Sequence, residues 1–391
     1  MDVKQIYSLM NTVSQEVLGE NALVQEDLTG VVDLGTAVFN ANAVDRYVKS
    51  LVNHIGKVIF VNRPYMGGVP SVLMDGWEYG SVLEKIHADL PTAVENKSWS
   101  LTDGTDYSPN VFHQPSVSAK FFNQKVTFEI ELSFTELQLK QSFSSAEQLN
   151  GFLSMLYNAV DKSMTVKTDS LIMRTINNMI AETIWDEYHN NDTPPVLGSL
   201  SAKSGVRAVN LLKLYNTKFG ESLTTANALV TPEFIRFASM QIALYQQRMS
   251  KISKIFNVGG KDRFTTSDML HVVFLTDFMA AAGAYLQSDT FHENFTALPN
   301  AETVPYWQGS GTTYDFDSVS KINVTTSAEH AVEAGGILGV MFDRDALGVA
   351  NLDKRVTTNY NAKAEFFNNF YKFDAGYFND LNENFVVFFI A

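Results

Sequence analysis

The chain of 391 residues contains no cysteine, which excludes a disulfide framework, a thiolate metal ligand and a cysteine nucleophile. Its stability must therefore come from packing, and the composition fits assembly in a reducing cytoplasm. No apolar run approaches the about 18 residues that a membrane-spanning helix needs. Residues 1–17 mix charged and apolar residues and lack the uninterrupted apolar segment of a signal peptide. We therefore expect a soluble protein that does not enter a membrane.

Charged residues are also scarce, at 18% of the chain against 45% hydrophobic residues, a composition typical of globular proteins. At this length we expect two or three lobes, because a single core seldom grows so large. The formal net charge of −14 repels nucleic acid on average, so tight, sequence-specific binding to nucleic acid is not expected.

The usual catalytic motifs are missing. There is no phosphate loop, no HExxH, no Gly-x-Gly-x-x-Gly and no nucleophile elbow. The seven histidines are spread along the chain, and no two are three or four residues apart. We therefore predict no catalytic residue, no cofactor and no metal site.

Two local clusters offer weaker alternatives. Asp186, Glu187 and His189 could bind a cation or act as acid and base, although a solvated loop beside a packed tryptophan is the preferred interpretation. Three tryptophans in polar or glycine-flanked contexts could form a sugar-binding platform, but packing or interface anchoring is at least as natural: Trp77, Trp99 and Trp307.

Proline is distributed very unevenly. Five prolines fall in residues 63–124, which predicts a long excursion, a hairpin with a short helical piece over Trp77–Ile86. Strict alternation predicts a strand over Lys125–Phe134 with one buried face. No proline follows until Pro194, and helical spacing predicts one helix from Ser145 to about Thr183, about 58 Å long.

The remaining elements are predicted from local patterns. Residues 190–205 contain Pro194 and Pro195 and indicate a boundary. A proline in the first turn predicts a helix start at Thr231–Glu233. We also expect helices over Ala41–His54 and Thr276–Gln287, and strands over Lys57–Asn62, Asp268–Leu275, Ile322–Thr325 and Gly336–Phe342.

The last 49 residues contain no proline and many aromatics. They begin with the phrase Asp-Arg-Asp-Ala-Leu-Gly-Val at Asp343–Val349, continue through aromatic segments at Phe366–Phe373 and Gly376–Asn384, and close on Phe385–Ile390. Because a chain end is normally solvated, six apolar residues there predict an interior strand. This order resembles the C-terminal part of major capsid proteins of tailed bacteriophages, which share the HK97 fold.

The resemblance implies an α+β fold of the HK97 type, with a long spine helix, a peripheral domain and an inserted axial domain. It places the following parts on the chain: an N-terminal arm at 1–40, the start of the peripheral domain at 41–62, an extended loop at 63–124, the peripheral-domain strand and spine helix at 125–195, the axial domain at 196–350 and C-terminal peripheral-domain strands at 351–391.

The resemblance further implies self-assembly into hexamers and pentamers of an icosahedral head, in the host cytoplasm, around double-stranded DNA that the protein meets only non-specifically. Scaffolding, portal and decoration proteins are then candidate partners. Some family members cross-link an extended-loop lysine to a neighbour's asparagine; Lys85 or Lys97 would be that lysine here, but no motif marks the reaction.

Charge is segregated along the chain, which indicates where copies could touch. Residues 203–263 hold ten basic and three acidic residues, whereas residues 71–110 hold seven acidic and two basic ones. Opposite patches on identical copies could steer head-to-tail contacts, although two solvated faces that never meet are the more frequent outcome. The candidates for contact between subunits are Trp77, Glu78, Lys97, Trp99, Arg248, Lys251, Lys254 and Arg263.

Two alternatives stay open at this point. One is an encapsulin-like compartment shell with the same fold and an enclosed cargo enzyme. The other is a cytosolic carbohydrate-active hydrolase that uses paired carboxylates.

For the capsid function, we expect that deletion of residues 70–109 leaves a soluble folded core and abolishes closed shells.

Overall fold

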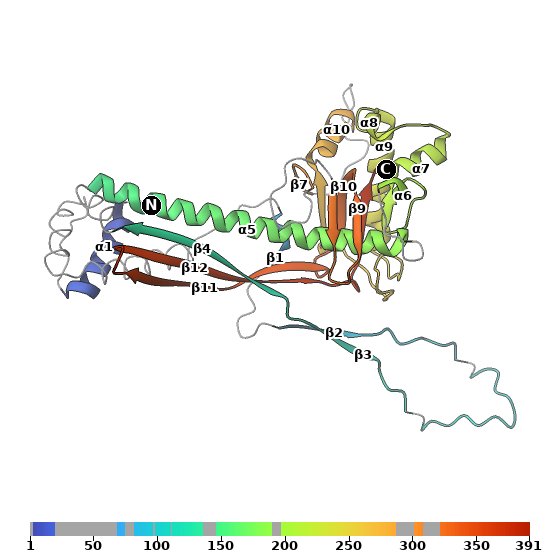
Figure 1. Ribbon diagram of the computed structural model, residues 1–391. Coiled ribbons are helices and arrows are strands. Elements are labelled where there is room, and N and C mark those ends of the chain that lie inside the picture. Colours follow the sequence, from blue (N-terminus) through green and yellow to red (C-terminus); the bar gives the residue numbers. More distant parts are fainter. Residues whose placement is uncertain are drawn as a thin grey trace. The chain divides into compact units, whose positions relative to one another are not determined.

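The computed structural model describes residues 3–19, 69–74, 82–96, 98–110, 112–135, 146–189, 197–286, 301–307 and 321–391. These residues form helices together with a four-stranded, a five-stranded and two two-stranded sheets (Figure 1). The predicted α+β class is therefore confirmed. The chain divides into two compact units, the first made of residues 1–78, 125–171 and 349–376 and the second of residues 79–124, 172–348 and 377–391.

The sheet of the first unit has the strand order β1-β11-β12-β4. Its strands are β1 (Leu73–Met74), β4 (Lys125–Thr135), β11 (Leu347–Asn361) and β12 (Phe366–Asn379). In β4, Val126, Phe128, Ile130 and Leu132 are half-buried while the residues between them are exposed, so the predicted strand and its period of two are confirmed. Helix α1 (Val3–Leu18) also belongs to this unit, and the 3₁₀ turn η1 (Pro70–Val72) precedes β1.

Helix α5 (Ala146–Tyr188) has 43 residues and measures about 65 Å at a rise of 1.5 Å per residue. The predicted helix is confirmed, but it ends five residues later than expected. Its last turn is stabilised by tertiary contacts that the sequence does not display: the Glu187 carboxylate accepts hydrogen bonds from the backbone N–H groups of Val206, Arg207 and Ala208. The interpretation of Asp186 and Glu187 as part of a solvated loop is therefore wrong.

The second unit contains the five-stranded sheet, with the order β5-β13-β10-β6-β7. Its strands are β5 (Ala208–Asn210), β6 (Leu270–Leu275), β7 (Glu302–Val304), β10 (Ile337–Asp343) and β13 (Phe385–Phe389). The C-terminal strand β13 pairs with β10 on one side and β5 on the other, and all five of its residues are buried. The prediction of an interior C-terminal strand is confirmed.

The other elements of this unit agree closely with the local patterns. Its helices are α6 (Leu197–Leu200), α7 (Leu211–Phe219), α8 (Thr225–Ala228), α9 (Pro232–Met249) and α10 (Thr276–Leu286). The predicted start at Thr231–Glu233 is confirmed because Thr231 is the N-cap residue of α9. Strands β8 (Ile322–Thr325) and β9 (Ala331–Ala334) form a small antiparallel sheet.

The predicted excursion contains an antiparallel hairpin of β2 (Leu83–Ala88) and β3 (Val117–Phe122) (Figure 1). The helical piece predicted over Trp77–Ile86 is wrong where the structure describes it, since residues 83–86 are in β2. Leu83 and Ile86 have helical spacing, but pairing with β3 overrides this local preference. Residues 77–81, the rest of the N-terminal arm after residue 19, and the elements predicted at 41–54 and 57–62 lie outside the described residues.

Candidate assembly interface

The two faces of the β2–β3 hairpin differ in burial. Leu83, Lys85 and His87 of β2 are partly buried, whereas the alternating residues Glu84, Ile86 and Ala88 are exposed. On β3 the residues directly opposite, Lys120 and Phe122, share the buried face, because Lys85 pairs with Lys120 and Leu83 with Phe122 in the ladder. One face of the hairpin is therefore covered by other parts of the second unit, and the other is open to solvent.

A single buried carboxylate holds both strands of the hairpin. Asp380, in the turn between β12 and β13, has a side chain that is 0% exposed; Lys85 Nζ donates to its Oδ2 at 2.9 Å and Lys120 Nζ to its Oδ1 at 3.0 Å. Two like charges directly opposite each other would repel, but here each ammonium group faces its own oxygen of the shared carboxylate. Burial disfavours the charged carboxylate, yet Lys85 and Lys120 outweigh it and hold the pKa of Asp380 below its usual value.

Further contacts fix the position of the hairpin on this turn. Lys85 Nζ also donates to the backbone oxygen of Asp345 at 2.7 Å, and the ring of Phe122 lies 5.2 Å from that of Phe378. The backbone N–H of Asp380 donates to Ala346 O at 2.7 Å, so the turn itself is tied to the chain after β10. The hairpin base is therefore anchored by ion pairs, backbone bonds and aromatic packing together.

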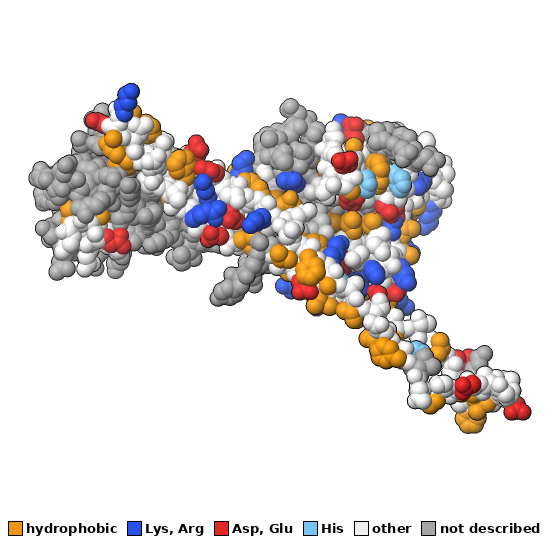
Figure 2. All heavy atoms as spheres, turned by 60° about the horizontal axis from the view of Figure 1, so that its bottom comes forward, with side chains coloured by type: hydrophobic (Ala, Val, Ile, Leu, Met, Phe, Trp, Pro, Cys, Tyr) orange, Lys and Arg blue, Asp and Glu red, His pale blue; other side chains and the backbone are white. Residues whose placement is uncertain are grey.

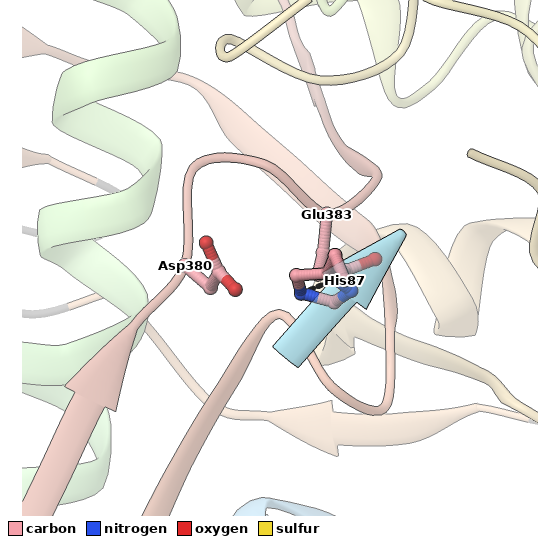
Figure 3. A group of neighbouring side chains, drawn as sticks. All are labelled: His87, Asp380 and Glu383. Carbon is pink, nitrogen blue, oxygen red and sulfur yellow. Dashed lines mark ion pairs between the residues drawn. The ribbon is translucent and has the colours of Figure 1, made fainter. Parts of the chain in front are cut away.

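Glu383, in the same turn, forms a second ionic contact. Its carboxylate lies 3.3 Å from Arg263 Nε and 3.4 Å from His87 Nε2. Figure 3 shows His87, Asp380 and Glu383 gathered at this turn, a group whose spacing would admit a metal ion. However, Lys85, Lys120 and Arg263 already supply positive charge to both carboxylates. The geometry therefore favours a network of ion pairs over metal coordination.

Beyond the strands, the chain from Asp89 to Ser116 forms a loop with a closed neck. The Asp89 N–H donates to Ser116 O at 2.9 Å, the Ser116 hydroxyl donates to Asp89 Oδ2, and Lys261 Nζ lies 3.1 Å from Asp89 Oδ1. The Ser116 and Lys261 contacts lower the pKa of Asp89. Outside the neck, Val94, Trp99 and Phe112 are 83%, 99% and 84% exposed. Figure 2 shows hydrophobic side chains along the hairpin and its loop.

Clustered apolar side chains at this level of exposure are typical of an interaction surface. Leu90, Leu101 and Tyr107 on the loop and Ile86, Val117 and Phe121 on the open face of the strands are exposed as well. The hairpin thus combines a fixed base with a solvated apolar surface, which is the arrangement expected of an element that binds another chain.

The residues proposed from the sequence fall in different places. Trp99 lies on the exposed loop, and Arg248, Lys251 and Lys254 are exposed at the end of α9 and in the turn after it. Arg263 is instead mostly buried against Glu383. Trp77, Glu78 and Lys97 lie outside the described residues.

The structure also brings part of the acidic and basic stretches together within one chain. A pocket of about 340 Å³ at the loop neck is lined by Asp89, Leu90, Lys254, Gly259, Gly260, Lys261, Asp262 and Arg263.

The sequence did not reveal the anchor of the hairpin, formed by Lys85, Lys120, Asp380 and Glu383. No sequence signal could have found it, because about 260 residues separate Lys120 from Asp380.

The structure gives other roles to the acidic cluster at Asp186–His189 and to one of the three tryptophans. Glu187 is a structural acceptor of backbone N–H groups, and Arg207 forms an ion pair with Asp186. Trp185 stacks between His189 and His330, and Trp307 is completely buried, so Trp307 cannot serve as a sugar-binding surface.

Among the described helices, none combines the length and the apolar composition that crossing a bilayer requires. No curated protein matches the chain. The chain is similar to the capsid structure of Staphylococcus phage Andhra, with 10% identity over 84% of this chain and 86% of that one and a TM-score of 0.47. It is also similar to the capsid structure of Cyanophage P-SCSP1u, with 10% identity, 82% and 86% coverage and a TM-score of 0.45.

The capsid of bacteriophage PhiM1 gives a comparable likeness, with 10% identity, 85% and 88% coverage and a TM-score of 0.41. The family model of the Phi29-like phage major capsid protein matches residues 10–389, nearly the whole chain. This match confirms the prediction of a structural capsid protein and does not favour the compartment shell or the hydrolase. The chain therefore belongs to the Phi29-like phage major capsid protein family.

Proposed function

We propose that this protein assembles into hexamers and pentamers of an icosahedral phage head that encloses double-stranded DNA, and that the loop at residues 89–116 contacts a neighbouring copy. Assembly takes place in the host cytoplasm, and the mature protein is part of the virion. Scaffolding, portal and decoration proteins are further partners of this shell. The protein acts mechanically, and no residue is assigned a catalytic role.

The observation that carries this proposal is the exposed apolar loop on an anchored base. Trp99 and Phe112 are large side chains left almost entirely in water. Fully burying such a side chain contributes roughly 2–3 kcal/mol, so a loop with several of them gains appreciably from covering by a neighbour. Because each copy carries the same loop, small gains per contact add up over a shell of many copies.

The order of elements supports an HK97-like division of the chain. We assign the arm to residues 1–40, the peripheral domain to residues 41–62, 125–195 and 351–391, the extended loop to residues 63–124 and the axial domain to residues 196–350. Helix α5 then corresponds to the spine helix, and β4, β11 and β12 to peripheral-domain strands. Strands β5, β6, β7 and β10 belong to the axial domain, and β13 from the C-terminal segment completes their sheet.

The experiment removes the loop and keeps its base. Because the hydrogen bond from Asp89 to Ser116 continues the ladder, residues 90–115 can be replaced by an Asn-Gly turn, which suits a two-residue hairpin. The wild-type protein should give shells or capsomers in negative-stain microscopy and sedimentation, while the shortened variant should stay folded by circular dichroism and form neither. Normal shells from the shortened variant would refute the role of the loop. A wild-type protein that forms neither capsomers nor shells, even when its scaffolding protein is present, would refute the proposed function.

A further inference from the structure

The surface formed by the end of α9 and the following turn combines exposed positive charge with exposed apolar side chains. This surface contains three basic residues, Arg248, Lys251 and Lys254, and two apolar ones, Ile252 and Ile255, and all five are exposed. We call this surface, together with the exposed Phe264, the basic patch. The bridge between Ser253 and Arg263 brings Phe264 next to the turn.

Most of the positive charge of the basic patch is not used within the chain. Lys254 lies 3.4 Å from Asp262, an exposed pair that contributes little. Arg248 packs over the ring of Tyr245, and among the described residues no carboxylate pairs with Arg248 or Lys251. In contrast, the neighbouring cations Lys261 and Arg263 are engaged by Asp89 and Glu383. The basic patch therefore offers free cations between apolar side chains.

The loop at residues 89–116 has the complementary composition. Glu95, Asp103 and Asp106 are exposed on it, interspersed with the exposed Trp99 and Phe112. None of the described basic residues pairs with these three carboxylates in the same chain. Both surfaces thus carry apolar groups interleaved with charge, and the signs of the charge are opposite.

We propose that the acidic apolar loop of one copy docks on the basic patch of a second copy. This inference rests on the proposed function and names the two surfaces that meet. The contact is heterologous, because a loop on each copy meets a patch on the next, and repeated contacts of this kind form a ring when the rotation between copies closes. Apolar burial supplies affinity, and the opposite charges select the register and speed association.

Charge reversal with rescue tests the pairing. The patch variant carries Lys251→Glu and Lys254→Glu, and the loop variant carries Asp103→Lys and Asp106→Lys. Each should lower the yield of capsomers and shells about tenfold or more, because like charges then face each other across the contact. The combined variant restores opposite charges and should assemble again. Thermal melting shows that each variant is folded.

A control variant carries Lys213→Glu and Lys218→Glu, which gives the same change in net charge on α7, outside the patch. It should assemble like the wild type. Normal assembly of the patch variant, or a folded combined variant that does not recover, would overturn the pairing of these surfaces. In either case shells formed by the wild-type protein would still support the proposed function. Failure of the pairing between loop and patch can therefore be told apart from failure of the proposed function. The contact should also weaken with rising salt, since exposed charges are screened.

Discussion

Replacing Asp380 by asparagine removes the one negative charge that holds both strands of the hairpin. The carboxylate is fully buried, whereas the side chains of Lys85 and Lys120 are 13% and 39% exposed. Removing one partner of a buried ion pair costs about 3–5 kcal/mol. Because Lys120 can turn to water and Glu383 remains 3.6 Å from Lys85, we expect a smaller loss of about 2–3 kcal/mol. Asparagine has the same size, so no cavity contributes.

This loss should appear as undocking of the hairpin base. Trypsin cleaves after lysine, and in the wild type Lys85 and Lys120 are both held by Asp380. If cleavage follows the population of the undocked form, a change of 2–3 kcal/mol raises cleavage after these two lysines about 30- to 150-fold. Mass spectrometry of the early fragments measures both rates separately. Since trypsin does not cleave after glutamine, each single variant is read at the remaining lysine. Lys85→Gln should raise cleavage after Lys120 more than Lys120→Gln raises cleavage after Lys85, because Lys85 is the more buried of the two.

The matched control is Glu129→Gln, which also turns a carboxylate into an amide but affects only an exposed pair with Lys372. Such pairs contribute at most about 1 kcal/mol, so cleavage after Lys85 and Lys120 should stay at the wild-type rate. Equal cleavage in Asp380→Asn and in Glu129→Gln would show that the shared carboxylate does not hold the hairpin.

Three further perturbations probe other parts of the chain. Since the pKa of Asp380 is lowered in the folded protein, its contribution to stability is present above the ordinary value of 3.8 and is lost as the pH falls through the lowered pKa. Between pH 5 and pH 3, the free energy of unfolding measured in urea should therefore fall less in Asp380→Asn than in the wild type. An equal fall in both proteins would contradict the ion-pair account. The double variant Trp99→Ser and Phe112→Ser should leave the melting temperature unchanged, because both side chains are exposed. It should weaken each contact between subunits by roughly 2 kcal/mol per side chain, which raises the critical concentration for shell assembly. An unchanged critical concentration would speak against burial of these rings in the shell. In Gly205→Ala the added Cβ would overlap the Glu187 carboxylate and lie 2.8 Å from Ala208 O, so the free energy of unfolding should fall by about 2 kcal/mol. The control is Gly283→Ala, whose Cβ meets nothing within 4 Å and whose φ is not positive, and which should not lower stability. A Gly205→Ala protein as stable as this control would exclude the steric explanation.

Most of the secondary structure could be predicted because it depends on local patterns. Three elements can be identified without knowing which strands or helices they contact: the alternating strand at Lys125–Thr135, helix α9 with its proline in the first turn, and the apolar C-terminal strand. The end of α5 could not be predicted, since Glu187 and Tyr188 remain helical through contacts with residues 203–208. The strand β2 was missed because Leu83 and Ile86 have helical spacing, which pairing with β3 overrides.

The anchor of the hairpin changes how the role of the loop must be tested. The deletion of residues 70–109 expected from the sequence to leave a folded core would also remove β1, β2 and Lys85, and would leave the buried Asp380 with one lysine partner fewer. A loss of shells in that variant would then report a damaged base as well as a missing loop. Replacement of residues 90–115 leaves Lys85, Lys120 and Asp380 in place, so any loss of assembly comes from the loop itself. A segment that looks like one excursion in the sequence therefore has two parts, an ion-paired base that belongs to the fold and an exposed loop that we propose contacts another copy.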